Sequence, residues 1–124
     1  MNTESLKGQF SFSKEERITN KKIIQKLFNS GEKINLFPFD FRYLIDGGNT
    51  NKVLISVSKS KISSSVKRNL IKRRIRESYR LNKLKLKKDG FYLAFIYSSS
   101  KILPFKDIKD SVILLLKQLN KTNE

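Results

Sequence analysis

Residues 52–82, KVLISVSKSKISSSVKRNLIKRRIRESYRLN, contain a strand pattern that is followed closely by a helix pattern. The first part, residues 52–58, alternates apolar and polar side chains, which is typical of a β-strand. Ser63 or Ser64 can cap the helix, because a serine oxygen at that position accepts a backbone N–H and contributes on the order of 1 kcal/mol. The stretch therefore predicts a strand, a short serine-rich loop and a helix that ends near Asn82.

The predicted helix carries a large positive charge. Residues 65–80 include seven lysines and arginines and a single acid, Glu77. At roughly 100 degrees per residue, Ile71, Ile75 and Tyr79 form an apolar row, and polar side chains occupy a contiguous side next to it. These polar residues are Arg68, Asn69, Lys72, Arg73, Arg76 and Arg80. A solvated charged face normally mixes signs, whereas planar guanidinium groups suit phosphate oxygens, so we expect this side to bind nucleic acid.

The chain begins with a polar arm and a short helix. Residues 1–17 contain few periodic apolar positions, so we expect a flexible arm whose FSF sequence at 10–12 docks on the body of the protein. Thr19 or Asn20 can cap a helix whose apolar residues have helical spacing. Gly31 stands in the favoured position to terminate that helix.

The next part of the chain predicts two strands. Residues 37–44, FPFDFRYL, alternate aromatic residues with other side chains and predict a strand. Pro38 should stand among the first residues of this strand, or the strand should lie on a sheet edge, because proline cannot donate a ladder hydrogen bond. Turn-forming residues at 46–51 separate it from the strand at 52–58. We therefore expect a β-hairpin between the two strands.

The last part of the chain predicts a buried strand and a helix. Residues 91–97, FYLAFIY, are a continuous apolar run of strand length, which favours a central strand with both faces covered. A final helix should pack on the sheet through one apolar face. That face comprises Ile108, Val112, Leu115, Leu116 and Leu119. The element order is α-β-β-α-β-α, which predicts a single α+β domain over residues 18–121.

Composition narrows the class of function. The chain has 124 residues, a net charge of +16 at pH 7 and a pI near 10.2, so we expect a polyanionic partner, nucleic acid before an anionic membrane. It has no apolar run of about eighteen residues and no secretory signal pattern, which favours a cytoplasmic protein. Histidine and cysteine are absent, and the eleven acidic residues are scattered. We therefore expect no catalytic residue, and no metal or other cofactor bound by protein residues.

The segment ISVSKSKISSSVKRNLIKRRIRES, residues 55–78, resembles the protein subunit of bacterial ribonuclease P. That family has a strand ending in a Ser-Val-Ser-Lys type sequence, a short loop, and Arg-Asn-Arg-x-Lys-Arg-x-x-Arg on a helix. The motif positions are held here by Arg68, Asn69, Lys72, Arg73 and Arg76. Leu70 stands where the family usually has arginine, and Ser63 stands where the loop commonly has glycine. The resemblance extends more loosely over residues 10–120.

The resemblance implies both a fold and a function. In this family an RNA subunit with bound Mg²⁺ removes the 5′ leader from precursor tRNA, and the protein is an accessory component that is inactive alone. The implied partners are the RNA subunit and precursor tRNA, with no membrane and no obligatory protein partner. The implied fold is a two-layer sandwich resembling domain 2 of ribosomal protein S5, with a cleft for single-stranded RNA. Its strand-helix-strand crossover is left-handed, whereas about 98% of such crossovers are right-handed.

Aromatic side chains and loop lysines are further candidates for RNA contact, because single-stranded RNA stacks its bases on aromatic rings within a basic groove. The candidate rings for the leader are Phe28 on the first helix and Phe39, Phe41 and Tyr43 on the first strand. Only one face of that strand can line a cleft, and an aromatic residue at strand spacing is more often part of the core. Lys59 and Lys61, in the strand-to-helix loop, are placed for phosphates, and Lys59 matches the family motif.

Two other functions stay open at this point. A helix-mediated DNA-binding module also presents a basic helix, but the turn between two helices and the recognition-helix spacing are not evident in this sequence. A peripheral membrane protein needs large apolar residues beside its basic rows. Binding to a ribozyme RNA, to duplex DNA or to anionic vesicles distinguishes the three.

Overall fold

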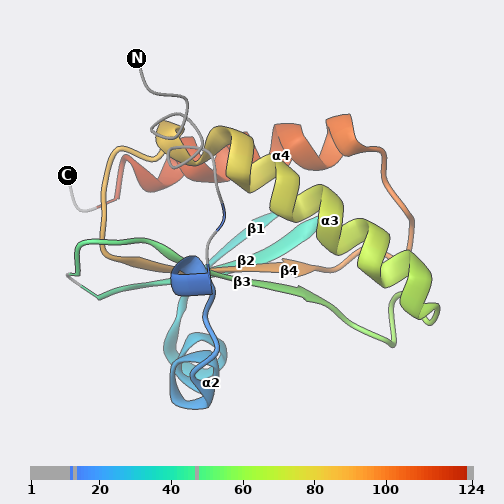
Figure 1. The fold of residues 1–124 in the computed structure, drawn as a ribbon, viewed down its shortest axis with the longest axis horizontal. Helices are drawn as coiled ribbons and strands as arrows, with labels where there is room; N and C mark the ends of the chain where they lie inside the picture. The colour runs from blue at the N-terminus through green and yellow to red at the C-terminus, as the bar shows by residue number, and fades with distance from the viewer. Residues whose placement is uncertain (1–11, 13, 47, 123–124) are drawn as a thin grey trace.

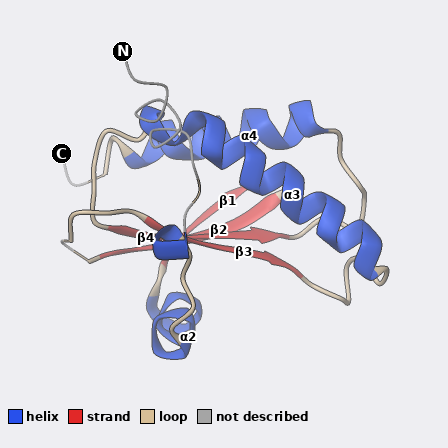
Figure 2. Ribbon diagram, viewed as in Figure 1, coloured by secondary structure: helices blue, strands red, loops and turns tan. Residues whose placement is uncertain are grey.

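The computed structural model describes residues 12, 14–46 and 48–122. Its elements in chain order are η1 (Lys14–Glu16), α2 (Lys21–Ser30), β1 (Glu32–Leu36), β2 (Phe39–Ile45), β3 (Lys52–Val57), α3 (Ser65–Asn82), η2 (Lys83–Lys85), β4 (Phe91–Tyr97) and α4 (Phe105–Leu119). Figure 1 shows α3 and α4 side by side above the four-stranded sheet and α2 below it. Figure 2 shows the same helix and strand layers coloured by type. The α+β fold class is confirmed.

The predicted hairpin between residues 37–44 and 52–58 is wrong. The strand order is β1-β2-β4-β3, so β4 lies between the two strands that follow each other in the sequence. β4 pairs antiparallel with β2 and parallel with β3. The physical reason is that β4 buries side chains on both faces, and a strand of this kind is most stable in the middle of a sheet.

The hairpin that does form joins β2 to β1, a strand that the sequence analysis missed. Ile34 of β1 lies opposite Phe41 of β2 in the antiparallel register. Phe37 and Pro38 form the turn between these strands, and the peptide bond between them is cis. Pro38 therefore precedes β2, at a point where no ladder hydrogen bond is required of it. β1 has only two partly buried residues in five, an alternation too weak to recognise in the sequence.

β3, α3 and β4 form a parallel strand-helix-strand crossover. In Figure 1 both strands point to the right, α3 lies above them, and β3 is nearer to the viewer than β4, so the crossover is left-handed. This is the hand that the resemblance implies, and the opposite of the common one. α3 contacts β3 and α4 contacts β1, so α3 lies over the β3 edge of the sheet and keeps one side in solvent.

The main core lies between the sheet and the α3–α4 layer. Ile71, Ile75 and Tyr79 of α3 are buried there, as predicted, and so are all five predicted apolar residues of α4. Aromatic rings from the strands fill the space between them. The rings of Phe39 and Phe95 pack edge to face with centroids 5.6 Å apart, an arrangement worth about 0.5–1.5 kcal/mol beyond the area buried.

α2 packs on the opposite face of the sheet. Leu27 of α2 is fully buried in a second apolar cluster with Ile18 and Ala94 of β4, whose small side chain leaves room for the helix. Asn20 caps α2 as predicted, because its side-chain oxygen accepts the backbone N–H of Lys22 at 2.8 Å. The predicted two-layer sandwich thus describes the sheet with α3 and α4, and α2 adds a helix to the second face.

The described part of the N-terminal arm contacts the domain. The ring of Phe12 packs edge-on against Tyr79, with 5.8 Å between centroids, which confirms the expected docking for this residue. Arg17 forms an isolated parallel bridge with Val53 on the outer edge of β3. Most of residues 1–17 lies outside the described residues, so the flexibility of the arm and the domain boundary after it stay predictions.

Replacing Tyr79 with alanine is expected to lower the free energy of unfolding by about 3–5 kcal/mol, because it leaves a cavity beside Phe12 and Phe95. Leu114→Ala is the matched control, since Leu114 is 55% exposed and surface substitutions usually change stability by less than about 0.5 kcal/mol. Denaturant unfolding followed by circular dichroism measures both variants. Equally small losses would show that Tyr79 does not hold α3 on the sheet.

Candidate nucleic-acid interface

Four cations of α3 form no side-chain ion pair or hydrogen bond within the described part of the chain. They are Lys67, Lys72, Arg73 and Arg76, and Asn69 is exposed on the same helix. Their helix is held on the sheet by its buried apolar row, so these side chains project from a fixed support. Because no internal ion pair has to be broken first, they can donate directly to phosphate oxygens.

Two other predicted RNA contacts on α3 have protein partners. Arg68 donates Nη1 to the carbonyl oxygens of Ile62 and Ser63, at 2.9 and 2.7 Å, and so fixes the loop before the helix. Arg80 donates Nε to Glu77 Oε2 at 2.9 Å. This hydrogen bond lowers the pKa of the Glu77 carboxyl and raises the pKa of Arg80. Both arginines add positive charge to the surface, but part of their donor capacity is already used.

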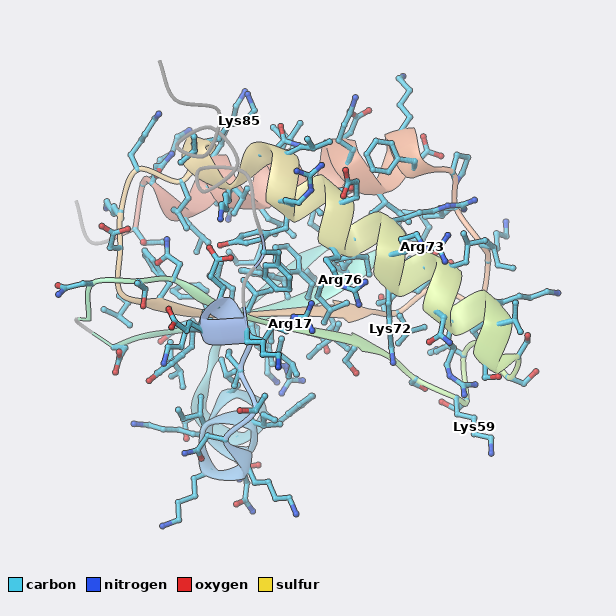
Figure 3. The ribbon with its side chains drawn as sticks, viewed as in Figure 1. Arg17, Lys59, Lys72, Arg73, Arg76 and Lys85 are labelled. Carbon is cyan, nitrogen blue, oxygen red and sulfur yellow. The ribbon has the colours of Figure 1, made fainter. Side chains whose placement is uncertain are left out.

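A basic band follows α3 and the outer edge of β3. It comprises Arg17, Lys59, Lys72, Arg73 and Arg76, which Figure 3 shows one after another beside these two elements. Lys61 is exposed in the same loop as Lys59, as predicted. Arg17 was missed by the sequence analysis, because it stands in the weakly patterned arm and only its bridge to β3 brings it here.

Two of the aromatic candidates are corrected by their burial. Phe39 and Phe41 are 2% and 0% exposed, so an RNA base cannot reach either ring in the folded protein. Tyr43 lies on the same face of β2, is half-buried, and packs against Phe91 with 5.9 Å between ring centroids. The aromatic face of β2 therefore points toward α3 and α4, and the other face of the strand points toward α2.

Phe28 is the aromatic candidate that stays accessible, with 39% of its surface exposed near the end of α2. Arg42 of β2 lies over it, with Cζ 5.3 Å from the ring centroid. Arg42 also donates Nη1 to the carbonyl oxygen of Phe28 at 2.5 Å and pairs with Asp40 at 3.2 Å. Such a cation–π contact contributes about 0.5–1 kcal/mol at an exposed site. Arg42, another residue that the sequence analysis missed, thus ties α2 to the sheet and orients Phe28.

A hollow of about 320 Å³ lies beside α2 on the same face of the sheet. It is lined by Ile23, Lys26, Leu44, Ile45, Asp46 and Tyr92. Burial raises the pKa of Tyr92, and the charge and hydrogen bond of Asp46 raise it further. Phe28 and Arg42 do not line this hollow, and we use the name α2 cleft for the sheet face around α2 that carries both the hollow and the separate contact of Phe28 with Arg42. Tyr92 was missed because the sequence predicts full burial for its strand.

The candidate interface consists of cationic and aromatic side chains. Among residues 12, 14–46 and 48–122, no group of three or more histidine, cysteine, aspartate and glutamate side chains is placed to hold a metal ion. Within the same residues, no helix is both long and apolar enough to span a bilayer. Cations that pair with no described residue on one side of the sheet, and an exposed ring on α2 on the other side, define a protein that binds nucleic acid.

Comparison with known proteins identifies the family. The family model described as Ribonuclease P matches residues 12–120. The ribonuclease P protein component of Clostridium botulinum (strain Loch Maree / Type A3) is 38% identical over 106 residues, which cover 85% of this chain and 95% of that protein. The corresponding protein of Dictyoglomus thermophilum is 34% identical over 108 residues, covering 86% and 89%. The chain therefore belongs to the ribonuclease P protein family, whose role is the 5′ maturation of tRNA as part of an endoribonuclease holoenzyme.

Solved structures share the fold. The ribonuclease P protein of Staphylococcus aureus matches with a TM-score of 0.73 at 24% identity, covering 87% of this chain and 98% of that one. The protein of Thermotoga maritima matches with a TM-score of 0.73 at 23% identity, covering 83% and 96%. Family membership implies an RNA partner, and nothing favours the DNA-binding alternative.

Arg73→Ala is expected to weaken RNA binding and to make the dependence of log affinity on log salt shallower by about 0.7–0.9, the value for one lost phosphate contact. Arg74→Ala is the matched control on the same helix. Arg74 donates Nη1 to the carbonyl oxygen of Leu103 at 2.6 Å, so its loss should lower stability and leave the salt slope unchanged. Binding to a structured RNA over a series of salt concentrations, with thermal melting of each variant, tests both. Identical slopes for the two variants would mean that the slope reports net charge alone.

Proposed function

We propose that this chain is the protein subunit of a ribonuclease P holoenzyme, which binds the catalytic RNA subunit through the basic band. The observation that carries the proposal is the set of cations on α3 without protein partners, because each can neutralise a phosphate and release its counterions. Lys59 and Lys61 extend the contact along the loop, and Arg68 and Arg80 add to the local positive field.

The α2 cleft is the proposed binding site for the 5′ leader of precursor tRNA. A leader is single-stranded, and a single strand binds through stacked bases and a basic surround rather than through groove geometry. Phe28 supports this assignment because its ring is accessible and is held in place by Arg42. Phe39 and Phe41 take no part, and Tyr43 belongs with them to the core side of β2.

Catalysis in this proposal belongs to the RNA subunit, and Mg²⁺ acts through that RNA rather than through protein ligands. The chain has no histidine and no cysteine, so the commonest general base and thiolate chemistry are missing from it. The protein contributes affinity and position for the substrate. A cytoplasmic location, where precursor tRNA is processed, belongs to the same proposal.

Reconstitution tests the proposal. The purified protein alone should leave precursor tRNA intact, and the RNA subunit of the same organism should remove the leader faster with the protein than without it. Because phosphate contacts weaken with salt, the stimulation should fall as ionic strength rises. Duplex DNA and anionic vesicles serve as competitors that test the two alternative functions. Hydrolysis by the protein alone, or no stimulation at low salt, would contradict the proposal.

Phe28→Ala is expected to reduce the affinity of the holoenzyme for leader-bearing precursor by about 1–3 kcal/mol, the usual value of one base stacked on an aromatic ring. Affinity for mature tRNA should stay nearly unchanged, since it has no leader. Phe37→Ala is the matched control, because Phe37 is 67% exposed in the turn between β1 and β2. The RNA subunit should be saturated with protein throughout, so that assembly does not contribute. Equal losses on both substrates would remove Phe28 from leader binding.

A further inference from the structure

A hollow at the outer edge of β3 lies outside the α2 cleft and borders the basic band through Arg76. It measures about 190 Å³ and lies where the N-terminal segment, β3 and α3 meet. Phe12 and Arg17 line it from the N-terminal segment, Ile55 from β3 and Arg76 from α3. Pockets that enclose a drug-sized ligand measure about 300–1,000 Å³. This hollow is therefore sized for a single ring system rather than for a whole small molecule.

One wall of the hollow is a preassembled stack. The Cζ atom of Arg17 lies 5.3 Å from the centroid of the Phe12 ring, in a cation–π contact. The Phe12 ring in turn packs edge-on against Tyr79, which is buried in the core. Both groups of the wall are therefore fixed without a ligand. Aromatic rings and guanidinium planes of this kind are the surfaces on which unpaired RNA bases stack.

The floor of the hollow offers backbone hydrogen-bonding groups. Ile18 donates its N–H to the carbonyl oxygen of Val53 at 3.0 Å, which shows that the backbone groups of Val53 point to the outer edge of β3. Because these groups alternate along a strand, the N–H and C=O of Ile55 point to the same edge. In the described part of the chain, nothing pairs with Ile55 on that side. A free donor and a free acceptor thus face the hollow.

The charges around the hollow are of one sign. Arg17 and Arg76 both border it, and neither forms an ion pair with a described residue. Lys72, one helical turn from Arg76, continues the same basic band. An uncharged ring compound would leave these cations unneutralised. A nucleotide supplies a ring for the wall, a polar edge for Ile55 and a phosphate for the arginines.

We propose that the hollow binds one unpaired nucleotide of the RNA subunit, with its base against Phe12 and Arg17, its edge on the backbone of Ile55 and its phosphate on Arg76. The RNA subunit is the source because Arg76 also belongs to the basic band that binds that RNA. The inference rests on the proposed function and adds a base-stacking site on the side of β3 away from β4. Phosphate contacts position the RNA on α3, and this site selects a register with an unpaired base.

A tryptophan reporter tests the site directly. The chain contains no tryptophan, so Phe12→Trp introduces a single indole into the wall of the hollow. Addition of the RNA subunit should quench its fluorescence at the same RNA concentrations that saturate binding. Phe37→Trp is the matched control at an exposed aromatic position away from the hollow, and its fluorescence should change little. Equal circular dichroism and melting temperature for both variants and the original protein establish that the fold is kept.

Substitutions at Arg17 separate stacking from charge. Arg17→Ala should weaken binding to the RNA subunit about five- to tenfold and reduce the quenching of the Phe12→Trp reporter. Arg17→Lys keeps the charge but loses the planar group, so it should recover only part of the affinity. Lys117→Ala on α4, which removes one exposed charge from outside the basic band, should leave both readouts nearly unchanged. Full recovery by Arg17→Lys would overturn the stacked geometry.

The outcomes also separate this site from the proposed function. If the Phe12→Trp protein binds the RNA subunit with unchanged affinity and stimulates cleavage but its fluorescence is not quenched, the nucleotide site is wrong and the proposed function stands. Quenching that appears only when leader-bearing precursor joins a preformed complex would show that the bound nucleotide comes from the precursor and not from the RNA subunit. Absence of any binding of the original protein to the RNA subunit would instead overturn the proposed function, and this site with it.

Discussion

The need to cover β4 on both faces and both edges organises the rest of the structure. Leu93 and Phe95 of this strand are fully buried on the side of α3 and α4, and Ala94 is fully buried on the side of α2. β2 and β3 occupy its two edges, although they follow each other in the chain. A seven-residue strand without a charged side chain is stable only in this position, so the hairpin expected from local pattern gives way to it.

The same arrangement creates the functional surfaces. Because β4 takes the centre, β3 becomes an edge strand, and α3 returns over that edge with its charged side in solvent. A left-handed crossover then sets the basic band along α3 and the outer edge of β3 (Figure 3). α2 is the single long helix on the other face of the described sheet, and the surface beside it becomes the α2 cleft. The two proposed RNA-binding surfaces thus lie on different sides of the sheet, one along α3 and the β3 edge and the other beside α2.

The division of the arginines explains how a chain of net charge +16 stays folded. Arg42, Arg68 and Arg74 donate to backbone carbonyl oxygens, and Arg80 pairs with Glu77. Arg42 holds the end of α2, and Arg68 holds the loop before α3. Arg74 joins α3 to the segment before α4, and Arg80 pairs within one turn of α3. The cations of the basic band have no such partners among the described residues, and their mutual repulsion is relieved when RNA phosphates approach. Some of the positive charge of this protein therefore stabilises the fold, and the rest is available to bind RNA.

The sequence by itself determined the three α-helices and the strands β2, β3 and β4, narrowed two helix caps to two neighbouring residues each, and located the buried row of α3 and the basic side next to it, because these follow from local spacing and side-chain chemistry. Period-two alternation shows that one face of β2 is aromatic, but it does not say which helix layer that face meets, so Phe39 and Phe41 could not be assigned to the core. Whether an arginine is free or bound depends on carbonyl oxygens far away in the chain, as Arg74 and Leu103 illustrate. Strand order, the partners of each arginine and the place of Arg17 beside β3 were decided by tertiary packing alone, because they depend on contacts between segments that have no common local pattern.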